Sequence, residues 1–104
     1  MSGPAEEHTG CLHLVAGDRR RTLADCLAHA GAGDALFFID AGVFHCLRSG
    51  FELPAALRES AWFAEADLDA RGLLAAALDS GLQVADDTVF VRLLKQHRHC
   101  LTWK

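Results

Sequence analysis

The apolar residues of this chain fall into short runs separated by polar residues, and one run is the clearest of them. Residues 35–39 are all apolar and lie between Asp34 and Asp40. The run is too short for an independent helix and lacks period-2 alternation, so it is typical of a strand covered on both faces. Parallel strands of this kind need long crossover connections, and helical patterns lie on both sides of the run. We expect the functional residues to lie near the ends of such strands.

The remaining patterns predict strands that alternate with helices. Four further strands are predicted at residues 11–16, 61–64, 82–85 and 100–103. Helices are predicted between them. The first follows Asp18, carries Cys26 and stops at Gly31 and Gly33, and short helices follow at residues 41–47 and 52–59. A longer helix is predicted from Asp67 to Gly81, and the last begins at residues 86–88, with an apolar face of Phe90, Leu93, Leu94 and His97.

Particular residues are expected to set the helix ends. Asp18 and Asp67 are expected to cap helices, and Pro54 suits a first helical turn. Gly72 is expected to break or kink its helix, which Gly81 then closes. The alternation of elements predicts an α/β fold: a single three-layer αβα domain of about five mostly parallel strands over residues 11–104, preceded by a flexible tail at residues 1–10.

Composition and charge narrow the class of protein. The 104 residues, 51% hydrophobic and 23% charged, are typical of one globular domain. The first ten residues are polar, unlike a secretory signal, and no apolar run approaches the roughly 18 residues that a membrane helix needs. We therefore expect a cytoplasmic protein without membrane contact. The net charge of −4 argues against tight nucleic-acid binding, and residues 19–21, three consecutive arginines, are interpreted as a solvated loop and first helical turn.

The sequence offers little support for a cofactor or a metal. The loop at residues 16–21 is neither GxGxxG nor a Walker A loop, so no nucleotide cofactor is expected. The densest group of metal-ligand types is His97, His99 and Cys100, which His45 and Cys46 could complete. Adjacent residues of a strand point to opposite faces, so these side chains would converge poorly, and we interpret the histidines as surface residues of a helix-to-strand corner.

The most informative of the four cysteines is Cys26. The others are Cys11, Cys46 and Cys100; none forms a CxxC motif, and all four are expected to be reduced thiols. Cys26 lies in the helix that follows the first strand, where the helix dipole and residues 19–21 would favour a thiolate. Leu23 and Leu27 share its helical face, which favours a buried thiol that fills the core. Both interpretations stay open at this point.

Three segments of the chain, taken in order, resemble the DsrH/TusB family of sulfur-relay proteins. The first joins Leu12-His13, Cys26-Leu27 and Leu36-Phe37-Phe38 to the turn at residues 40–44. The second, residues 62–72, is an aromatic strand followed by D-L-x-A-R-G. The third, residues 86–103, is similar to the family's D-Y-x-x-F-V-x-L-x-x-x-H and closing tryptophan. Asp87 stands where the family has Tyr, and the turn at residues 40–42 is one residue longer than in the family.

The resemblance implies a small α/β subunit that assembles with two relatives, one DsrE/TusD-like and one DsrF/TusC-like. In one branch of the family the complex relays persulfide sulfur to the wobble uridine of tRNA, and in the other it serves dissimilatory sulfur oxidation. In both, the main sulfur-carrying cysteine lies on another subunit. The DsrH branch has a cysteine in its first helix, and Cys26 falls on that position.

Two functional hypotheses follow. The leading one is a non-catalytic or auxiliary subunit of a cytoplasmic sulfur-relay complex, in which Cys26 is a partly accessible thiol that assists sulfur transfer. The alternative is a stand-alone thiol sulfurtransferase that uses Cys26 as its persulfide thiol. A nucleotide-binding module is a weaker third, opposed by the missing glycine loop. The high apolar fraction also predicts that the isolated chain, without its partners, self-associates or has poor solubility.

Overall fold

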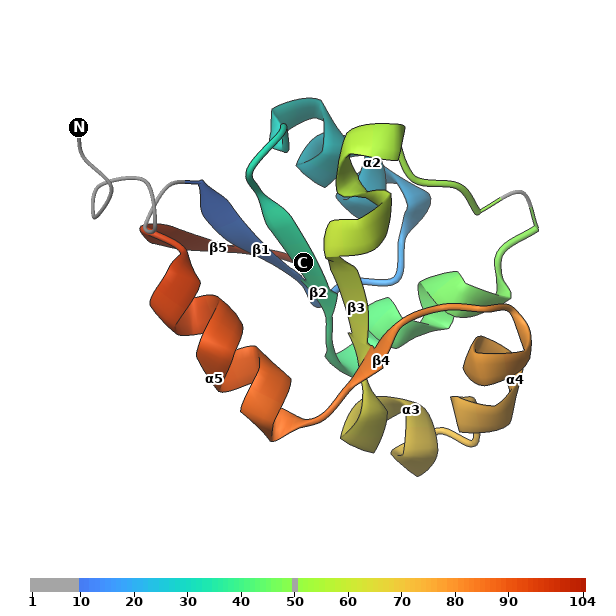
Figure 1. The fold of residues 1–104 in the computed structure, drawn as a ribbon. Coiled ribbons are helices and arrows are strands. Elements are labelled where there is room, and N and C mark those ends of the chain that lie inside the picture. Colours follow the sequence, from blue (N-terminus) through green and yellow to red (C-terminus); the bar gives the residue numbers. More distant parts are fainter. Residues whose placement is uncertain (1–9, 50) are drawn as a thin grey trace.

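The computed structural model describes residues 10–49 and 51–104, and these residues are built around one sheet (Figure 1). Five strands pair side by side in the order β4-β3-β2-β1-β5, and every pair is parallel. Their bounds are β1 Cys11–Val15, β2 Ala35–Phe38, β3 Ala61–Ala64, β4 Val84–Ala85 and β5 His99–Trp103. The predicted parallel α/β fold is therefore confirmed. The expected tail lies outside the described residues except for Gly10.

The central strand β2 explains why the sequence forms this sheet. All four of its residues are buried, as expected of a strand between two layers. Its neighbours on both sides are parallel, so the backbone groups of β2 are paired on both edges. The polar residues that flank it stop the run where the chain leaves the sheet.

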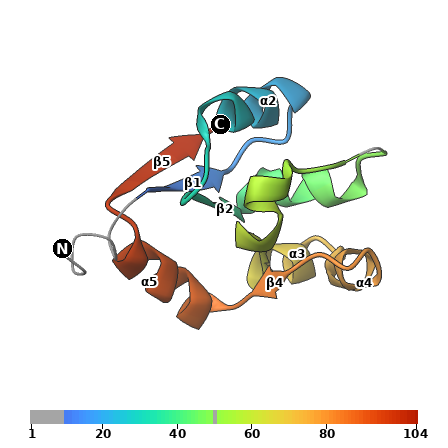
Figure 2. The ribbon, with the colours of Figure 1, turned by 45° about the horizontal axis from the view of Figure 1, so that its top comes forward.

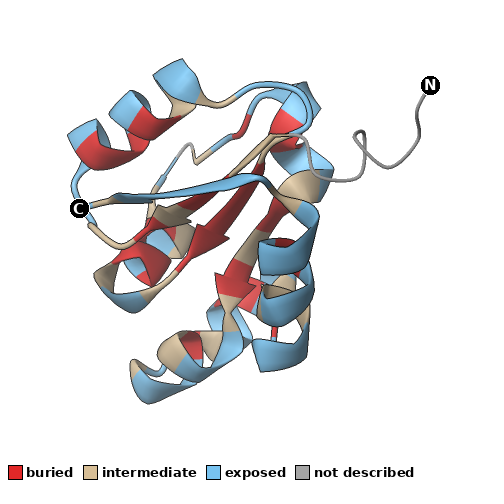
Figure 3. Ribbon diagram, turned by 90° about the vertical axis from the view of Figure 1, so that its left-hand side faces the viewer, coloured by how far each residue is buried: buried red, intermediate tan, exposed pale blue. Residues whose placement is uncertain are grey.

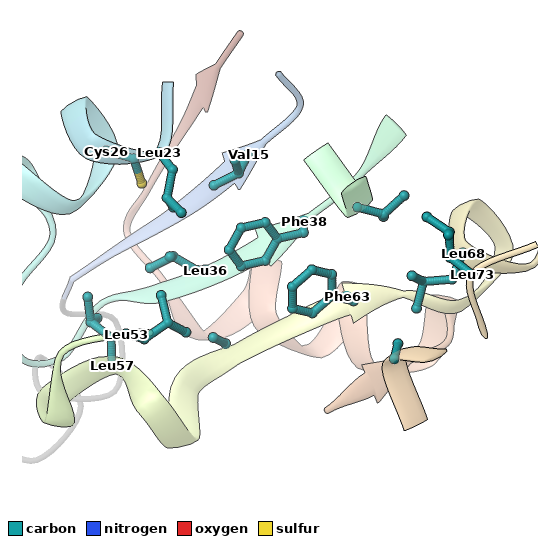
Figure 4. Close-up of a cluster of buried hydrophobic side chains, with 13 residues drawn as sticks. Val15, Leu23, Cys26, Leu36, Phe38, Leu53, Leu57, Phe63, Leu68 and Leu73 are labelled. Carbon is teal, nitrogen blue, oxygen red and sulfur yellow. The ribbon is translucent and has the colours of Figure 1, made fainter. Parts of the chain in front are cut away.

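One face of the sheet carries most of the helical structure. It is covered by α2 (Arg20–His29), η1 (Asp40–Leu47), η2 (Ala55–Ser60), α3 (Glu65–Ala70) and α4 (Leu74–Asp79), whose buried residues join one core cluster with that face. At its centre Phe38 and Phe63 stack with ring centroids 4.3 Å apart and planes 6° apart. Figure 4 shows these two rings between side chains from α2 and from the 3-10 and α3 segments. We call this the α2 face.

The opposite face is covered by a single helix, α5 (Asp87–Gln96), and we call it the α5 face. Figure 2 shows α2 and α5 on opposite sides of β1. The smaller core here consists of Leu12, Ala35, Phe37, Ala85 and Leu93, with the Phe90 ring 5.1 Å from Phe37. The three-layer arrangement is thus present, but its two outer layers differ greatly in extent.

Several predicted helix starts are wrong. Arg19, not Asp18, is the residue before α2, and its side chain makes no capping hydrogen bond. Helix α3 begins at Glu65 rather than after Asp67, because the Asp67 carboxylate accepts a hydrogen bond from a distant turn instead of from its own helix. The helices expected at residues 41–47 and 52–59 are both 3-10 helices.

Other predicted helix ends are confirmed. Gly72, with φ of +69°, separates α3 from α4, and Gly81, with φ of +76°, follows α4. Asp86 caps α5, because its carboxylate accepts hydrogen bonds from two backbone N–H groups of the first turn at 3.0 and 3.2 Å. Leu94, expected on the apolar face of α5, is 42% exposed, because its neighbour Leu93 takes the position against the sheet. No helix among residues 10–49 and 51–104 has the length and apolarity to cross a bilayer.

Candidate functional site

One cavity lies where the connections that follow two neighbouring strands leave toward opposite faces of the sheet. After β3 the chain enters α3, whose Leu68 belongs to the α2-face core. After β4 it enters α5, whose Leu93 belongs to the α5-face core. In open parallel sheets such a point forms a crevice outside the carboxyl ends of the strands. A cavity of about 450 Å³ occupies it here.

This cavity has an apolar floor and an acidic rim. Phe37, Ile39 and Phe90 are the large apolar residues that line it. The carboxylate residues around it come from three segments, namely η1, α3 and the start of α5: Asp40, Glu65, Asp67, Asp86 and Asp87. None of the lining residues is a cysteine or a histidine. The cavity is therefore suited to binding a group that is apolar or positively charged rather than to thiol chemistry.

Part of the acidic rim is already paired within the chain. Asp40 has a left-handed backbone (φ +50°), and its N–H donates to Asp67 Oδ2 at 2.9 Å. The Arg71 guanidinium lies 3.7 Å from the Asp67 carboxylate and 3.9 Å from the Asp40 carboxylate, and it also lies over the Phe44 ring at 5.9 Å. The D-L-x-A-R-G segment thus has a structural role: its aspartate and arginine hold the turn that follows β2.

The same turn requires a glycine for a steric reason. A Cβ atom on Gly42 would lie 1.9 Å from the carbonyl oxygen of Val15. Any side chain there would push η1 away from the end of β1, so the close approach of these two segments depends on glycine.

Cys26 is fully buried, so the expectation of a partly accessible thiol is wrong. Its exposed fraction is 0%, and it lies in the α2-face core (Figure 4). The pKa of its thiol is raised to about 12, mainly by burial and in smaller part by the nearby charges of Cys11 and Asp34. The dipole argument fails because α2 begins at Arg20, which places Cys26 in the second half of the helix, beyond the first turn where the dipole favours a thiolate.

The other three thiols are not activated either. Desolvation is the main cause that raises the pKa of Cys11, Cys46 and Cys100 above the ordinary value. The charge of Asp34 adds to the effect at Cys11. All four cysteines are free thiols. None of them is a thiolate at neutral pH in this structure.

The candidate metal ligands are not brought together. His97 follows α5, and its Nδ1 donates to the backbone carbonyl of Leu93 at 2.8 Å. His99 and Cys100 are consecutive exposed residues of β5, so their side chains point to opposite faces. His45 is a buried residue of η1. Within the described ranges no group of three or more His, Cys, Asp or Glu side chains could hold a metal ion.

Sequence reasoning missed a buried histidine in β1. His13 is 1% exposed; its Nε2 donates to Asp34 Oδ2 at 2.9 Å, and its Nδ1 accepts from Trp103 Nε1 at 3.0 Å. Because the indole can only donate, the ring is fixed in the Nε2–H form. Both ring nitrogens are occupied, so this His–Asp pair has no nitrogen free for a substrate. The only signal in the sequence is a histidine in the middle of an apolar strand.

Asp34 is the acceptor that organises this group. Its two carboxylate oxygens accept from the Cys11 N–H at 2.9 Å, the His13 ring at 2.9 Å and the Gly31 N–H at 3.2 Å. Burial raises the pKa of Asp34, but these hydrogen bonds outweigh it and hold the pKa below its usual value. The carboxylate thereby links β1 to the loop before β2, and His13 in turn contacts Trp103 of β5.

A second missed histidine, His45, holds η1 against the loop after β1. It is 0% exposed, its Nε2 donates to the Gly17 carbonyl at 2.9 Å, and its Nδ1 accepts from Arg48 Nε at 3.0 Å. The Arg48 guanidinium also donates to the carbonyl of Asp18. Burial is the main cause that lowers the pKa of His45. These contacts are structural, and they lie between segments about thirty residues apart.

Comparison with known proteins agrees with this architecture. The family model described as DsrH like protein matches residues 18–100, which is most of the chain. A search of curated proteins finds no match. The matched range includes α2 with Cys26, the Asp40 turn held by Asp67 and Arg71, and α5. On this evidence the chain belongs to the DsrH family.

Proposed function

We propose that this chain is a non-catalytic, auxiliary subunit of a cytoplasmic sulfur-relay complex. Membership of the DsrH family supports a sulfur-relay subunit. The observation that carries the auxiliary role is the state of the thiols: Cys26 is fully buried, and the pKa of every cysteine is raised. The subunit serves either 2-thiolation of the tRNA wobble uridine or, in the other branch, dissimilatory sulfur oxidation.

The chemistry of sulfur transfer explains why these thiols matter. A thiolate attacks the outer sulfur of a persulfide, a new S–S bond forms, the old one breaks, and the donor leaves as a thiolate. The acceptor must therefore be reachable and ionised. Cys26 meets neither requirement, which favours a carrier thiol on another subunit and disfavours a stand-alone sulfurtransferase that uses Cys26.

The proposed partners are two homologous subunits, one DsrE/TusD-like and one DsrF/TusC-like. The surface supports association: β5 is an edge strand exposed along nearly its whole length (Figure 3). Large apolar side chains at least 38% exposed lie on η1, α4, α5 and β5, namely Phe44, Leu47, Leu78, Val91, Leu94 and Leu101. No tight contact with nucleic acid and none with a membrane is part of the proposal.

Persulfide loading tests the auxiliary role. The isolated chain is incubated with a persulfide donor, and each cysteine is examined by mass spectrometry, first alone and then together with the two sibling subunits. We expect no stable persulfide on Cys26 in the folded chain alone, and loading of a sibling's thiol in the mixture. Stoichiometric loading of Cys26 without partners would replace the proposal with the stand-alone sulfurtransferase.

The pathway requires a separate test in the cell. Deletion of the gene, with re-expression of the wild-type chain or of a Cys26→Ala variant, is followed by measurement of 2-thiouridine in tRNA and of sulfur oxidation. An auxiliary subunit predicts that one of the two activities falls on deletion. Restoration by the Cys26→Ala variant shows that Cys26 itself does not carry sulfur.

A further inference from the structure

A second cavity lies at the other end of the sheet's carboxyl edge. Its volume is about 300 Å³, and it lies where β1 gives way to α2, beside the end of β5. The residues around it are Arg19, Arg21, Thr22, Asp25, Trp103 and Lys104. Three of these carry a positive side chain and one a negative side chain.

The start of α2 offers unused hydrogen-bond donors to this cavity. The helix is ten residues long, no side chain caps it, and its first turn contains no acidic residue. The backbone N–H groups of the first turn of a helix have no partner within the helix, and they carry the positive end of the helix dipole. Together these features favour an anion in front of the helix.

Thr22 supplies an independent sign that a ligand belongs here. The residue is 5% exposed and lines the cavity, yet its hydroxyl makes no hydrogen bond within residues 10–49 and 51–104. Its Oγ1 lies 3.1 Å from the position that a Cβ on Gly17 would take, so it faces the loop between β1 and α2. Buried hydroxyl groups are normally paired, and an unpaired one beside free N–H groups is suited to a shared acceptor.

The loop and the end of β5 are held in place around this point. The N–H groups of Ala16 and Gly17 both donate to the Trp103 carbonyl, at 2.8 and 3.2 Å. A Cβ on Gly17 would lie 2.5 Å from the carbonyl carbon of Lys104, so glycine allows these segments to meet. The one negative side chain, Asp25, pairs with Arg21 at 3.9 Å, but both are largely exposed and the pair is weak.

We propose that this cavity binds a small tetrahedral oxyanion of the phosphate or sulfate class. The backbone N–H groups of Arg21 and Thr22 and the Thr22 hydroxyl donate to its oxygens, and the side chains of Arg19 and Lys104 supply positive charge. The site lies apart from the acidic cavity and contains no thiol, so it is independent of the auxiliary role in sulfur relay.

The test is a titration of the full chain with inorganic phosphate at low ionic strength, followed by NMR of the backbone amides. We expect the amides of Arg21 and Thr22 and the Trp103 indole to shift saturably, and sodium chloride at the same ionic strength not to reproduce the shifts. Trp62, which is not among the residues that line this cavity, serves as the internal control. Shifts that sodium chloride reproduces would overturn the proposal.

Three variants separate a built site from general attraction. Thr22→Val removes the hydroxyl while keeping the shape, and Arg19→Gln removes one charge; each is expected to weaken phosphate binding by about tenfold. Arg20→Gln is the matched control, because Arg20 belongs to the same triplet but lines a different hollow, and it is expected to weaken binding by less than about twofold. Equal losses from Arg19→Gln and Arg20→Gln, or no loss from Thr22→Val, would refute the site.

The source of the oxyanion is distinguished by parallel titrations. A nucleoside 5′-monophosphate that binds more tightly than inorganic phosphate, with the same variant pattern, indicates a phosphate ester as the ligand, and equal affinities indicate the free ion. A single-stranded RNA is titrated in the same way, with its concentration counted in phosphate groups. If the RNA shifts the same amides at a lower concentration than inorganic phosphate and the nucleotide do, the assignment to a small ion is wrong.

Discussion

The two faces of the sheet are covered by different amounts of helical structure. On the α2 face, five helical segments cover an aromatic centre, and two buried histidines hold loops to strand ends. On the α5 face, one helix covers a small cluster, and the β5 edge beside it is exposed. The difference indicates that the α2 face carries most of the stability, while the α5 face and the β5 edge retain the surface with which the chain can associate.

The sharpest test of this comparison is the removal of the central ring. Phe38→Ala should destabilise the fold by about 3–5 kcal/mol, because it leaves a cavity beside Phe63 in the larger core. Phe90→Ala, on the partly exposed side of α5, should cost about 1–2 kcal/mol. Urea unfolding measures both. Equal losses would show that the two faces contribute equally.

Cys26 provides the next largest effect on the α2 face. Cys26→Ser places a hydroxyl without a partner in the core and should cost about 1–3 kcal/mol, whereas Cys100→Ser on the exposed strand should change stability by less than about 0.5 kcal/mol. Alkylation of the native chain should modify Cys100 first and Cys26 only on unfolding. Rapid modification of native Cys26 would contradict its burial and restore the accessible-thiol hypothesis.

His45 makes the α2 face sensitive to pH. Its folded pKa lies below the ordinary value, so the unfolded chain binds the proton more readily. The stability that neutral His45 contributes is therefore present above about pH 6.5 and is lost as pH falls through that value toward the folded pKa. Unfolding measured between pH 8 and pH 5 should show a weaker pH dependence for His45→Gln than for wild type. An equal pH dependence in His45→Gln and in wild type would show that His45 is not its source.

The smallest effect on stability, and the clearest on association, is expected from the outer surface of α5. We predict that the isolated chain self-associates, and that Leu94→Lys reduces this association while changing stability by less than about 0.5 kcal/mol. Gln96→Lys, at an exposed polar position of α5, is the control, because it adds the same charge without removing an apolar side chain. Sedimentation of the wild type as a monomer at high concentration would be incompatible with this prediction.

The comparison also shows what the sequence could predict. The apolar run of β2 and the glycine after α3 act through local conformation, so both were found from neighbouring residues. The role of Asp67 could not be predicted from neighbouring residues, because its carboxylate accepts from the N–H of Asp40, which lies 27 residues away. A carboxylate near a helix start resembles a cap whichever N–H group it binds.

Some features of the site residues could likewise be predicted from neighbouring residues, and others depend on distant ones. Leu23 and Leu27 correctly indicated that Cys26 lies on an apolar face. The sequence did not show that α2 begins at Arg20, and therefore did not show how far Cys26 lies from the helix N-terminus. His13 and Trp103 are 90 residues apart, and no periodic pattern relates them. Hydrophobic periodicity predicts which layer a residue occupies, while hydrogen bonds between distant segments require the folded chain.

The pairing of β1 with β5 has a consequence for the order of folding. The first strand and the last strand of the described chain lie side by side over five residues, from Cys11 beside His99 to Val15 beside Trp103. During synthesis β1 can pair with β2 early, but its other edge has no partner until residues 99–103 have emerged. Such late, non-local pairing slows folding and leaves an open strand edge in the nascent chain. In that interval the edge is available to a strand from another copy, so exchange of β5 between two chains is the characteristic misassembly that this topology allows.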